Sequence, residues 1–222
     1  MTALSKEQCR EIIAKRAALE FSAGDIITLG IGLPTEVANY LPDNLHIMVQ
    51  SENGMIGVGS RDLSAPQDAK IINAGGLPVK AKDGAVFFDT AMSFTIIRGG
   101  HVNATVLGAL QVDEEGNLAN WMVPHVFTPG MGGAMDLVVG AKKVIVAMEH
   151  TAKGEPRIVK KCTLPLTAAH EVDMIITERA VIEVTPNGLL LAEVNPLFSL
   201  DEVIASTGAD LIIPDSLLRQ AG

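Results

Sequence analysis

Cysteine is scarce in this sequence, and its scarcity excludes two ways of stabilising a small protein. The 222 residues contain two cysteines, Cys9 and Cys162, and neither belongs to a CxxC pair. The pattern therefore supports neither a disulfide framework nor a zinc site. His101, His125 and His170 are scattered without the spacing of metal ligands, so we expect no metal. The low cysteine content suits a reducing compartment, and we expect a cytoplasmic protein.

Long hydrophobic runs and basic blocks are also missing. No stretch approaches the ~18 apolar residues that a membrane helix requires. The N-terminal sequence MTALSKEQCREIIAKR contains no apolar signal region, so we expect no processing and no membrane association. The formal net charge is −9, which argues against nucleic acid as a partner.

Aromatic residues make up only 4% of the chain, although 48% of it is hydrophobic. The core must therefore consist mainly of Val, Ile, Leu, Ala and Met, which is typical of strands that are buried on both faces. This composition predicts a layered α/β fold. The length suits a single domain over residues 1–222.

Apolar runs, capping signals and turn residues predict the order of the elements. Capping boxes at Ser5/Gln8 and Ser199/Glu202 begin two of the helices. We expect helices at 6–22, 35–41, 91–98, after 133 and after 199, strands at 25–29, 46–49, 70–72, 102–110, 144–148 and 173–177, hairpins at 79–88 and 180–193, and a polar connection at 61–68.

The stretch QSENGMIGVG, residues 50–59, contains the candidate reacting residue. Glu52 follows the predicted strand 46–49 and precedes Asn53-Gly54, so a sharp turn would present its carboxylate at the rim of a sheet, where α/β proteins keep their chemistry. An ordinary solvated turn has the same composition, and the stretch alone leaves both interpretations open.

Two glycine loops could face a ligand. The first, Gly30-Ile31-Gly32-Leu33-Pro34, lacks the third glycine of a dinucleotide site, because position 35 is Thr, and the chain contains no GxxxxGK[ST]. Its amides could contact a carbonyl or phosphate, but tight strand-to-helix packing explains the spacing equally well.

The second glycine loop spans residues 129–136 and opens a predicted helix. Its glycines, Gly130, Gly132 and Gly133, would leave several backbone N–H groups free to converge on an anion, as in an oxyanion hole. A flexible surface loop is the alternative, but Met131 and Met135 are unusual in such a loop.

These features suit acyl transfer with a glutamate nucleophile. The chain has no GxSxG elbow for a Ser-His-Asp mechanism. Glu149-His150 could be an acid/base pair, but neighbours on a strand point to opposite faces, so a structural or surface role is favoured.

Several motifs together resemble the β subunit of family I CoA transferases, nearest to the 3-oxoacid and the acetate or butyrate:acetoacetate types. The resemblance covers about residues 10–212. The motifs are GIGLP (30–34), SENG (51–54), INAGG (72–76), IRGGH (97–101), LGALQVD (107–113), LANWMVP (118–124), GMGGAMDLV (130–138) and KKCTLPLT (160–167). One departure is Pro124-His125-Val126, where relatives often carry Pro-Gly-Lys.

The resemblance implies a doubly wound α/β fold with a mixed, largely parallel sheet. It also implies that Glu52 is the catalytic glutamate and that Gly133, beside Gly132, donates to the oxyanion. The residues implied to lie near the acyl-CoA are Gly30, Gly32, Leu33, Pro34, Asn53 and Asn120.

The resemblance further implies the activity and its partners. The expected function is transfer of coenzyme A between a short-chain acyl-CoA (succinyl-, acetyl- or butyryl-CoA) and a 3-oxo acid such as acetoacetate, through a glutamyl-CoA thioester. Coenzyme A is then a substrate, and no cofactor is expected. The expected partner is an α subunit in an α2β2 assembly. An acyl-CoA hydrolase and a non-catalytic ligand-binding module remain alternatives.

Overall fold

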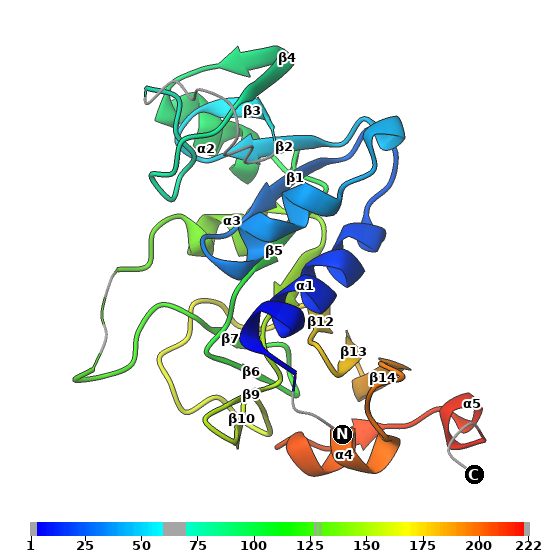
Figure 1. Cartoon of the computed structure of the whole chain (residues 1–222). Helices are drawn as coiled ribbons and strands as arrows, with labels where there is room; N and C mark the ends of the chain where they lie inside the picture. The colour runs from blue at the N-terminus through cyan, green and yellow to red at the C-terminus, as the bar shows by residue number, and fades with distance from the viewer. Residues whose placement is uncertain (1–3, 60–69, 127, 129, 220–222) are drawn as a thin grey trace.

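A ten-stranded sheet runs through the protein, as seen in a computed structural model (Figure 1) that describes residues 4–59, 70–126, 128 and 130–219. Its strand order is β15-β14-β13-β12-β8-β5-β1-β2-β3-β4. Five central strands are parallel: β2 (Met48–Ser51), β1 (Ile26–Leu29), β5 (Ala104–Leu107), β8 (Val144–Ala147) and β12 (Met174–Ile176).

Antiparallel strands extend this centre on both sides. One side adds β3 (Met55–Val58) and β4 (Ala81–Phe87). The other adds β13 (Ala180–Thr185) and β14 (Gly188–Val194), and β15 (Leu211–Ile212) then pairs parallel to β14. The expected mixed, largely parallel sheet of an α/β fold is confirmed.

Helices cover both faces of the sheet, and alternation along the strands explains the two cores. In β8, Ile145 and Ala147 face a core that includes residues of α1 (Lys6–Ala17). Val144 and Val146 face the other core, with residues of α2 (Thr90–Arg98) and α3 (Ala134–Gly140). Strands buried on both faces need continuous apolar runs, which is why the aliphatic composition suits this fold.

Short elements complete the chain. They are the 3-10 helices η1 (Ala18–Glu20), η2 (Leu33–Tyr40) and η3 (Asp43–Leu45), the three-stranded sheet of β6 (Gln111–Asp113), β7 (Leu118–Ala119) and β11 (Ile158–Val159), the pair β9 (Thr151–Ala152) and β10 (Glu155–Pro156), and the helices α4 (Leu200–Ser206) and α5 (Asp215–Leu218).

Local signals located several boundaries correctly. Ser5 and Ser199 each form the predicted capping box, and the Asn187-Gly188 turn joins β13 to β14. The helix expected at 6–22 is shorter, since the α-helix ends at Ala17 and η1 follows. The helix expected at 35–41 is the 3-10 helix η2, which begins at Leu33.

The hairpin predicted around Asp83-Gly84 is wrong. Residues Ala81–Phe87 form one strand, β4, whose pairing partner is β3. The register shifts between the pairs Ile56/Val86 and Val58/Ala81, so the extra residues of β4 are absorbed as a bulge. Asp83-Gly84 therefore lies at an irregularity within the edge strand β4 and not at the turn of a hairpin, because β4 pairs with β3.

Other strands begin or end at different residues from those predicted. His46 adopts a left-handed conformation (φ 49°), so β2 begins at Met48 and continues to Ser51. The strand expected at 70–72 is reduced to a single bridge between Ile72 and Pro78. The strand expected at 102–110 is confined to β5, and the connection at 61–68 lies outside the described residues.

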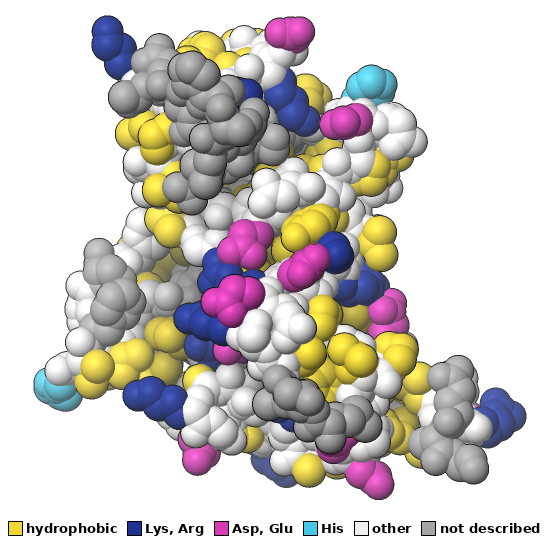
Figure 2. Space-filling view, viewed as in Figure 1, with side chains coloured by type: hydrophobic (Ala, Val, Ile, Leu, Met, Phe, Trp, Pro, Cys, Tyr) yellow, Lys and Arg dark blue, Asp and Glu magenta, His cyan; other side chains and the backbone are white. Residues whose placement is uncertain are grey.

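Charged side chains of both signs intermingle on the face that carries α1 (Figure 2). Arg10 pairs with Glu36, and Arg16 pairs with both Glu20 and Glu193. This face thus has no single-sign field, despite the net charge. Within the described ranges, no helix is long and apolar enough to cross a membrane.

Candidate active site

The sheet reverses its winding at β1 and β5, and a cavity lies at their carboxyl ends. From β1 the chain moves outward to β2, whereas from β5 it moves to β8 on the other side. Such a switch point leaves a crevice in which α/β proteins bind ligands. The cavity has a volume of about 520 Å³, and its lining includes Gly30, Glu52, Gly108, Asn120 and Gly133.

Glu52 lies in the tight turn between β2 and β3. The Gly54 N–H donates to the Ser51 carbonyl (3.0 Å), which closes the turn. Gly54 has φ +120°, and a Cβ at this position would collide with the Phe88 carbonyl oxygen. The Phe88 N–H donates in turn to the Gly54 carbonyl (2.9 Å). Only glycine fits here, so the turn is fixed against the chain that follows β4.

Gly133 contacts the carboxylate of Glu52 from the start of α3. A Cβ on Gly133 would collide with Glu52 Oε2 and would lie 2.9 Å from Cδ. Oε2 is buried and has no hydrogen-bond partner among the described residues. The second glycine loop and the glutamate turn, which are far apart in the sequence, are therefore in direct contact.

The surroundings of Glu52 disfavour its charged form. Burial raises the pKa of this carboxyl above its ordinary value, the backbone amide of Gly133 acts in the opposite direction, and the charge of Asp136 adds to the rise. Asp136 is itself paired with Arg98 of α2 (2.6 Å). A poorly solvated carboxylate is a more reactive nucleophile than one in water, provided that it remains ionised.

Asn120 lines the same cavity and is held in place by its own hydrogen bonds. Its Nδ2 donates to the Gly108 carbonyl (3.1 Å), and its Oδ1 accepts from the Thr167 hydroxyl (2.6 Å). These contacts orient the loop that follows β5. Gly130, Met131 and Gly132 also line the cavity.

Other residues that the resemblance implied lie elsewhere. The Asn53 side chain donates to the Ile72 carbonyl (2.8 Å) and is absent from the cavity lining. Leu33 packs against the core, and Pro34 is buried. Gly32 lines a neighbouring cavity. The segment Pro124-His125-Val126 is exposed and does not line the cavity.

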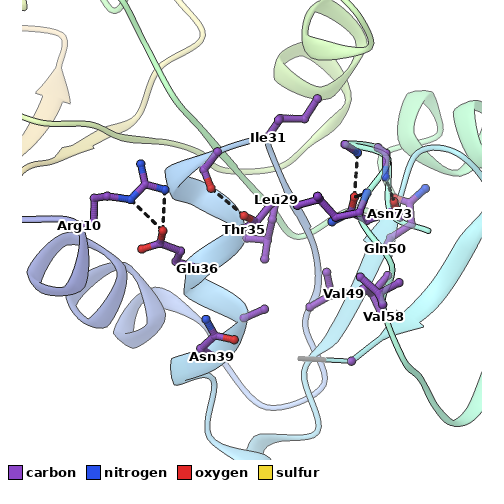
Figure 3. A pocket seen from close by; sticks show the side chains of 18 residues that line it. Arg10, Leu29, Ile31, Thr35, Glu36, Asn39, Val49, Gln50, Val58 and Asn73 are labelled. Atoms are coloured by element: carbon purple, nitrogen blue, oxygen red, sulfur yellow. Dashed lines mark hydrogen bonds and ion pairs between the residues drawn. The ribbon is translucent and has the colours of Figure 1, made fainter. Parts of the chain in front are cut away.

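The neighbouring cavity has a volume of about 610 Å³ and adjoins the first. The two share lining residues: Leu29, Ile31, Gln50, Ser51 and Ala74. In Figure 3, Thr35, Glu36 and the ion pair from Glu36 to Arg10 lie on one side, opposite Gln50 and Asn73. The pair of cavities gives an extended ligand room to lie along η2.

Sequence reasoning did not select Gln50, although it lines both cavities. Its Nε2 donates to the Ser93 hydroxyl (2.9 Å), and its buried Oε1 has no hydrogen-bond partner in the described part of the chain. A polar residue at the end of an apolar strand next to Glu52 was the available signal.

His150 is remote from this chemistry and has a structural role. It is fully buried, and its ring nitrogens lie 2.9 Å from the hydroxyls of Thr177 and Thr207. Burial lowers its pKa to about 4, and the charge of Arg179 contributes. No cluster of three or more potential metal ligands occurs among residues 4–59, 70–126, 128 and 130–219.

Comparison with known proteins identifies the family. Residues 10–206 match the coenzyme A transferase family. The chain belongs to this family. It is 56% identical to the acetate CoA-transferase subunit beta of Haemophilus influenzae, over 93% of this chain and 92% of that one. It is 49% identical to the mitochondrial succinyl-CoA:3-ketoacid coenzyme A transferase 2A of Rattus norvegicus, over 94% of this chain but 41% of that protein.

A solved structure supports the fold of this coenzyme A transferase chain. The acyl-CoA transferase of Escherichia coli O157:H7 superposes with a TM-score of 0.74 at 21% identity. The match covers 98% of this chain and 44% of that one, so this chain spans less than half of that structure. At this identity the likeness concerns the fold alone.

Proposed function

We propose that this chain is the β subunit of a coenzyme A transferase in which Glu52 is the nucleophile. The observation that carries the proposal is the half-buried Glu52 carboxylate in a cavity at the switch point, in contact with the backbone of Gly133. Family membership supports the same chemistry. The acceptor and donor are a 3-oxo acid such as acetoacetate and a short-chain acyl-CoA, in keeping with relatives named for acetate and for 3-ketoacids.

The first half-reaction loads coenzyme A onto the protein. A Glu52 oxygen attacks the thioester carbonyl, the C–S bond breaks, and an acyl-glutamyl anhydride and a thiolate result. The thiolate then attacks Glu52 Cδ, and the donor acid leaves as a carboxylate. The product is a glutamyl-CoA thioester, and the electron pairs balance without any net proton transfer.

The second half-reaction reverses these steps with the acceptor acid. Its carboxylate attacks Cδ and expels the thiolate, which then attacks the acceptor's acyl carbon and regenerates Glu52. Each attack creates a tetrahedral oxyanion. The amides of Gly132 and Gly133 are the proposed donors to it, and such donors contribute on the order of 100- to 1000-fold in rate.

The proposed enzyme needs a second type of subunit. Relatives of this length are named as beta subunits, and the rat relative is more than twice as long as the matched region. We propose an α2β2 assembly. Both cysteines are free, which suits the reducing cytoplasm proposed as its location.

The decisive experiment is an intact-mass measurement. The chain is purified with its α-type subunit, acetoacetyl-CoA is added without an acceptor acid, and the reaction is quenched in acid. The expected product is a CoA-sized adduct on the peptide that contains Glu52, and Glu52→Gln should abolish both adduct and exchange while assembly is retained. Glu11→Gln is the matched control and should keep the adduct, because Glu11 lies on the exposed side of α1, pairs with Lys15 and lines neither of the two cavities.

Other results would contradict the proposal. An adduct on another residue, or wild-type exchange by Glu52→Gln, would show that the nucleophile is wrong. Steady release of free CoA without an acceptor, at the rate of exchange, would identify a hydrolase.

A further inference from the structure

Phe94 of α2 lies behind the contact between Glu52 and Gly133. A Cβ on Gly133 would lie 3.1 Å from Phe94 Cζ and 2.9 Å from Glu52 Cδ, so the tip of the ring and the carboxylate both lie against Gly133. Phe94 lines neither of the two cavities and packs instead against the core beneath α2 and α3. The ring therefore closes the side of the contact that is away from the cavity.

The charges around the ring suit its orientation. Phe94 Cζ belongs to the edge of the ring, where the quadrupole of an aromatic ring is positive, and this edge lies nearest the Glu52 carboxylate. The Arg98 guanidinium lies over the ring, 5.7 Å from its centre, where the negative face attracts a cation. An anion near the edge and a cation over the face both favour this position of the ring.

Arg98 connects the ring to the loop of Gly133. Its Nε donates to Asp136 Oδ1 (2.6 Å) in the first turn of α3, and the Asp136 N–H donates to the Gly133 carbonyl (3.0 Å). Further along the two helices, a Cβ on Gly140 would collide with the Ile97 carbonyl oxygen, so α2 and α3 are packed closely. The position of Gly133 therefore depends on α2.

The same helix is attached to the Glu52 turn. The Ser93 hydroxyl accepts from Gln50 Nε2 of β2 (2.9 Å). Just before α2, the Phe88 N–H donates to the Gly54 carbonyl (2.9 Å). Phe94 thus belongs to the one helix that contacts both the turn that presents Glu52 and the glycine loop that meets it.

Water threatens the intermediate of the proposed reaction. Water could attack Cδ of the glutamyl-CoA thioester and break the C–S bond, which would give the Glu52 carboxylic acid and free CoA thiol. Water would supply the oxygen and both protons. Glu52 Oε2 is buried and has no hydrogen-bond partner among the described residues. Whether water reaches this carboxyl group decides between transfer and hydrolysis.

We propose that Phe94 is a positioning residue that shields the Glu52 carboxyl group from water and thereby favours transfer over hydrolysis. The inference rests on the proposed function, which supplies the thioester on Glu52. Phe94 acts through Glu52 and Gly133 and does not touch the substrate, since it lines neither cavity. Arg98 and Asp136 keep the ring and the glycine loop together.

The ratio of CoA release to CoA exchange tests the proposal. The enzyme assembled with its α-type subunit receives acetoacetyl-CoA with or without acetate as the acceptor, and free thiol and acetyl-CoA are measured. Phe94→Leu should raise the ratio of release to exchange on the order of tenfold, because closing a site against water is what suppresses hydrolysis of a reactive intermediate. Phe94→Met gives the same test if the leucine variant does not assemble.

Phe198→Leu is the matched control. Phe198 also packs against this core, and the Arg179 guanidinium lies over its ring, 5.1 Å from the centre. Phe198 directly precedes the N-cap of α4 and lines neither cavity. Phe198→Leu should therefore lower the Tm about as much as Phe94→Leu does, but it should leave the release-to-exchange ratio unchanged.

A pH profile of exchange separates this role from a merely structural one. Burial is the largest cause of the raised pKa of Glu52, and the charge of Asp136 adds to it. Phe94→Leu should lower this pKa and move the acidic fall in exchange to lower pH. Arg98→Met leaves Asp136 without its ion pair and should move the fall to higher pH at low ionic strength, where charges are weakly screened.

Either of two results would overturn the inference. One is an unchanged release-to-exchange ratio in the Phe94 variants, or an equal rise in Phe198→Leu. The other is a pair of pH profiles that shift in the same direction in Phe94→Leu and Arg98→Met. Failure of the proposed function is distinguishable, because it would appear in the wild type as the absence of exchange and of a Glu52 adduct.

Discussion

A methyl group at Gly133 should disable the reaction without unfolding the protein. The Cβ of Gly133→Ala would collide with Glu52 Oε2 and would lie 2.9 Å from Cδ and 3.1 Å from Phe94 Cζ. Atoms in contact prefer about 3.5–4.0 Å, and Oε2 is closer to the new Cβ than Cδ is, so the carboxylate must move by more than roughly 1 Å. A misplacement of about 1 Å costs on the order of 100-fold in rate, and we expect that loss in kcat.

The backbone at Gly133 tolerates alanine, so stability should barely change. Its φ is −86°, in a region open to all residues. A Gly→Ala change at such a site raises the free energy of unfolding by about 0.4–1 kcal/mol, because it restricts the unfolded chain. This gain offsets part of the steric cost of the new Cβ. The assay is the initial rate of CoA exchange by the assembled enzyme, together with its Tm.

Glu52→Asp provides the control for this mechanism. The shorter side chain withdraws the carboxylate from Gly133, so Gly133→Ala should cost little further activity in the Glu52→Asp background. Non-additivity of this kind is expected when two changes act on one contact. If the two losses multiplied, Gly133 would act independently of the position of Glu52, and the reasoning would be refuted.

Three further predictions concern stability and pH. Gly54→Ala should lower the unfolding free energy by more than about 2 kcal/mol in chemical denaturation, because φ is +120° and the new Cβ meets Phe88 O; an unchanged denaturation midpoint would contradict the tightness of the turn. The pKa of His150 is lowered to about 4, so its imidazole is neutral in the folded protein at neutral pH. Its contribution to the free energy of unfolding is therefore complete above the unfolded pKa near 6.5 and is lost as the pH falls towards 4. The loss should total roughly 3 kcal/mol, read as the difference between wild type and His150→Gln, and parallel pH profiles would show that His150 is not the group responsible. The raised pKa of Glu52, caused mainly by burial, predicts that exchange falls in mildly acidic solution as the nucleophile is protonated; a rate that stayed constant down to the ordinary pKa of a glutamate would exclude this effect.

The sequence by itself determined the features that depend on neighbouring residues. Ser5 and Ser199 form their capping boxes because the partner lies three residues on, and Asn187-Gly188 forms its turn because both strands are adjacent in the chain. The sharp turn after Glu52 was also readable, since a glycine at position 54 permits a backbone that other residues do not. The aliphatic composition was enough to predict strands buried on both faces.

The tertiary structure decided everything that depends on which distant segments meet. Asp83-Gly84 has the composition of a hairpin, yet β4 pairs with the earlier strand β3 and absorbs these residues as an irregularity. Spacing alone left the role of each glycine loop open. The winding of the sheet then brought the loop of Gly133 against Glu52 and left Gly32 in the adjoining cavity. Local sequence determines backbone conformation through short-range sterics and hydrogen bonds, whereas strand order follows from burial summed over the whole chain. The site needs both, because the local turn presents Glu52 and the strand order brings Gly133 to it.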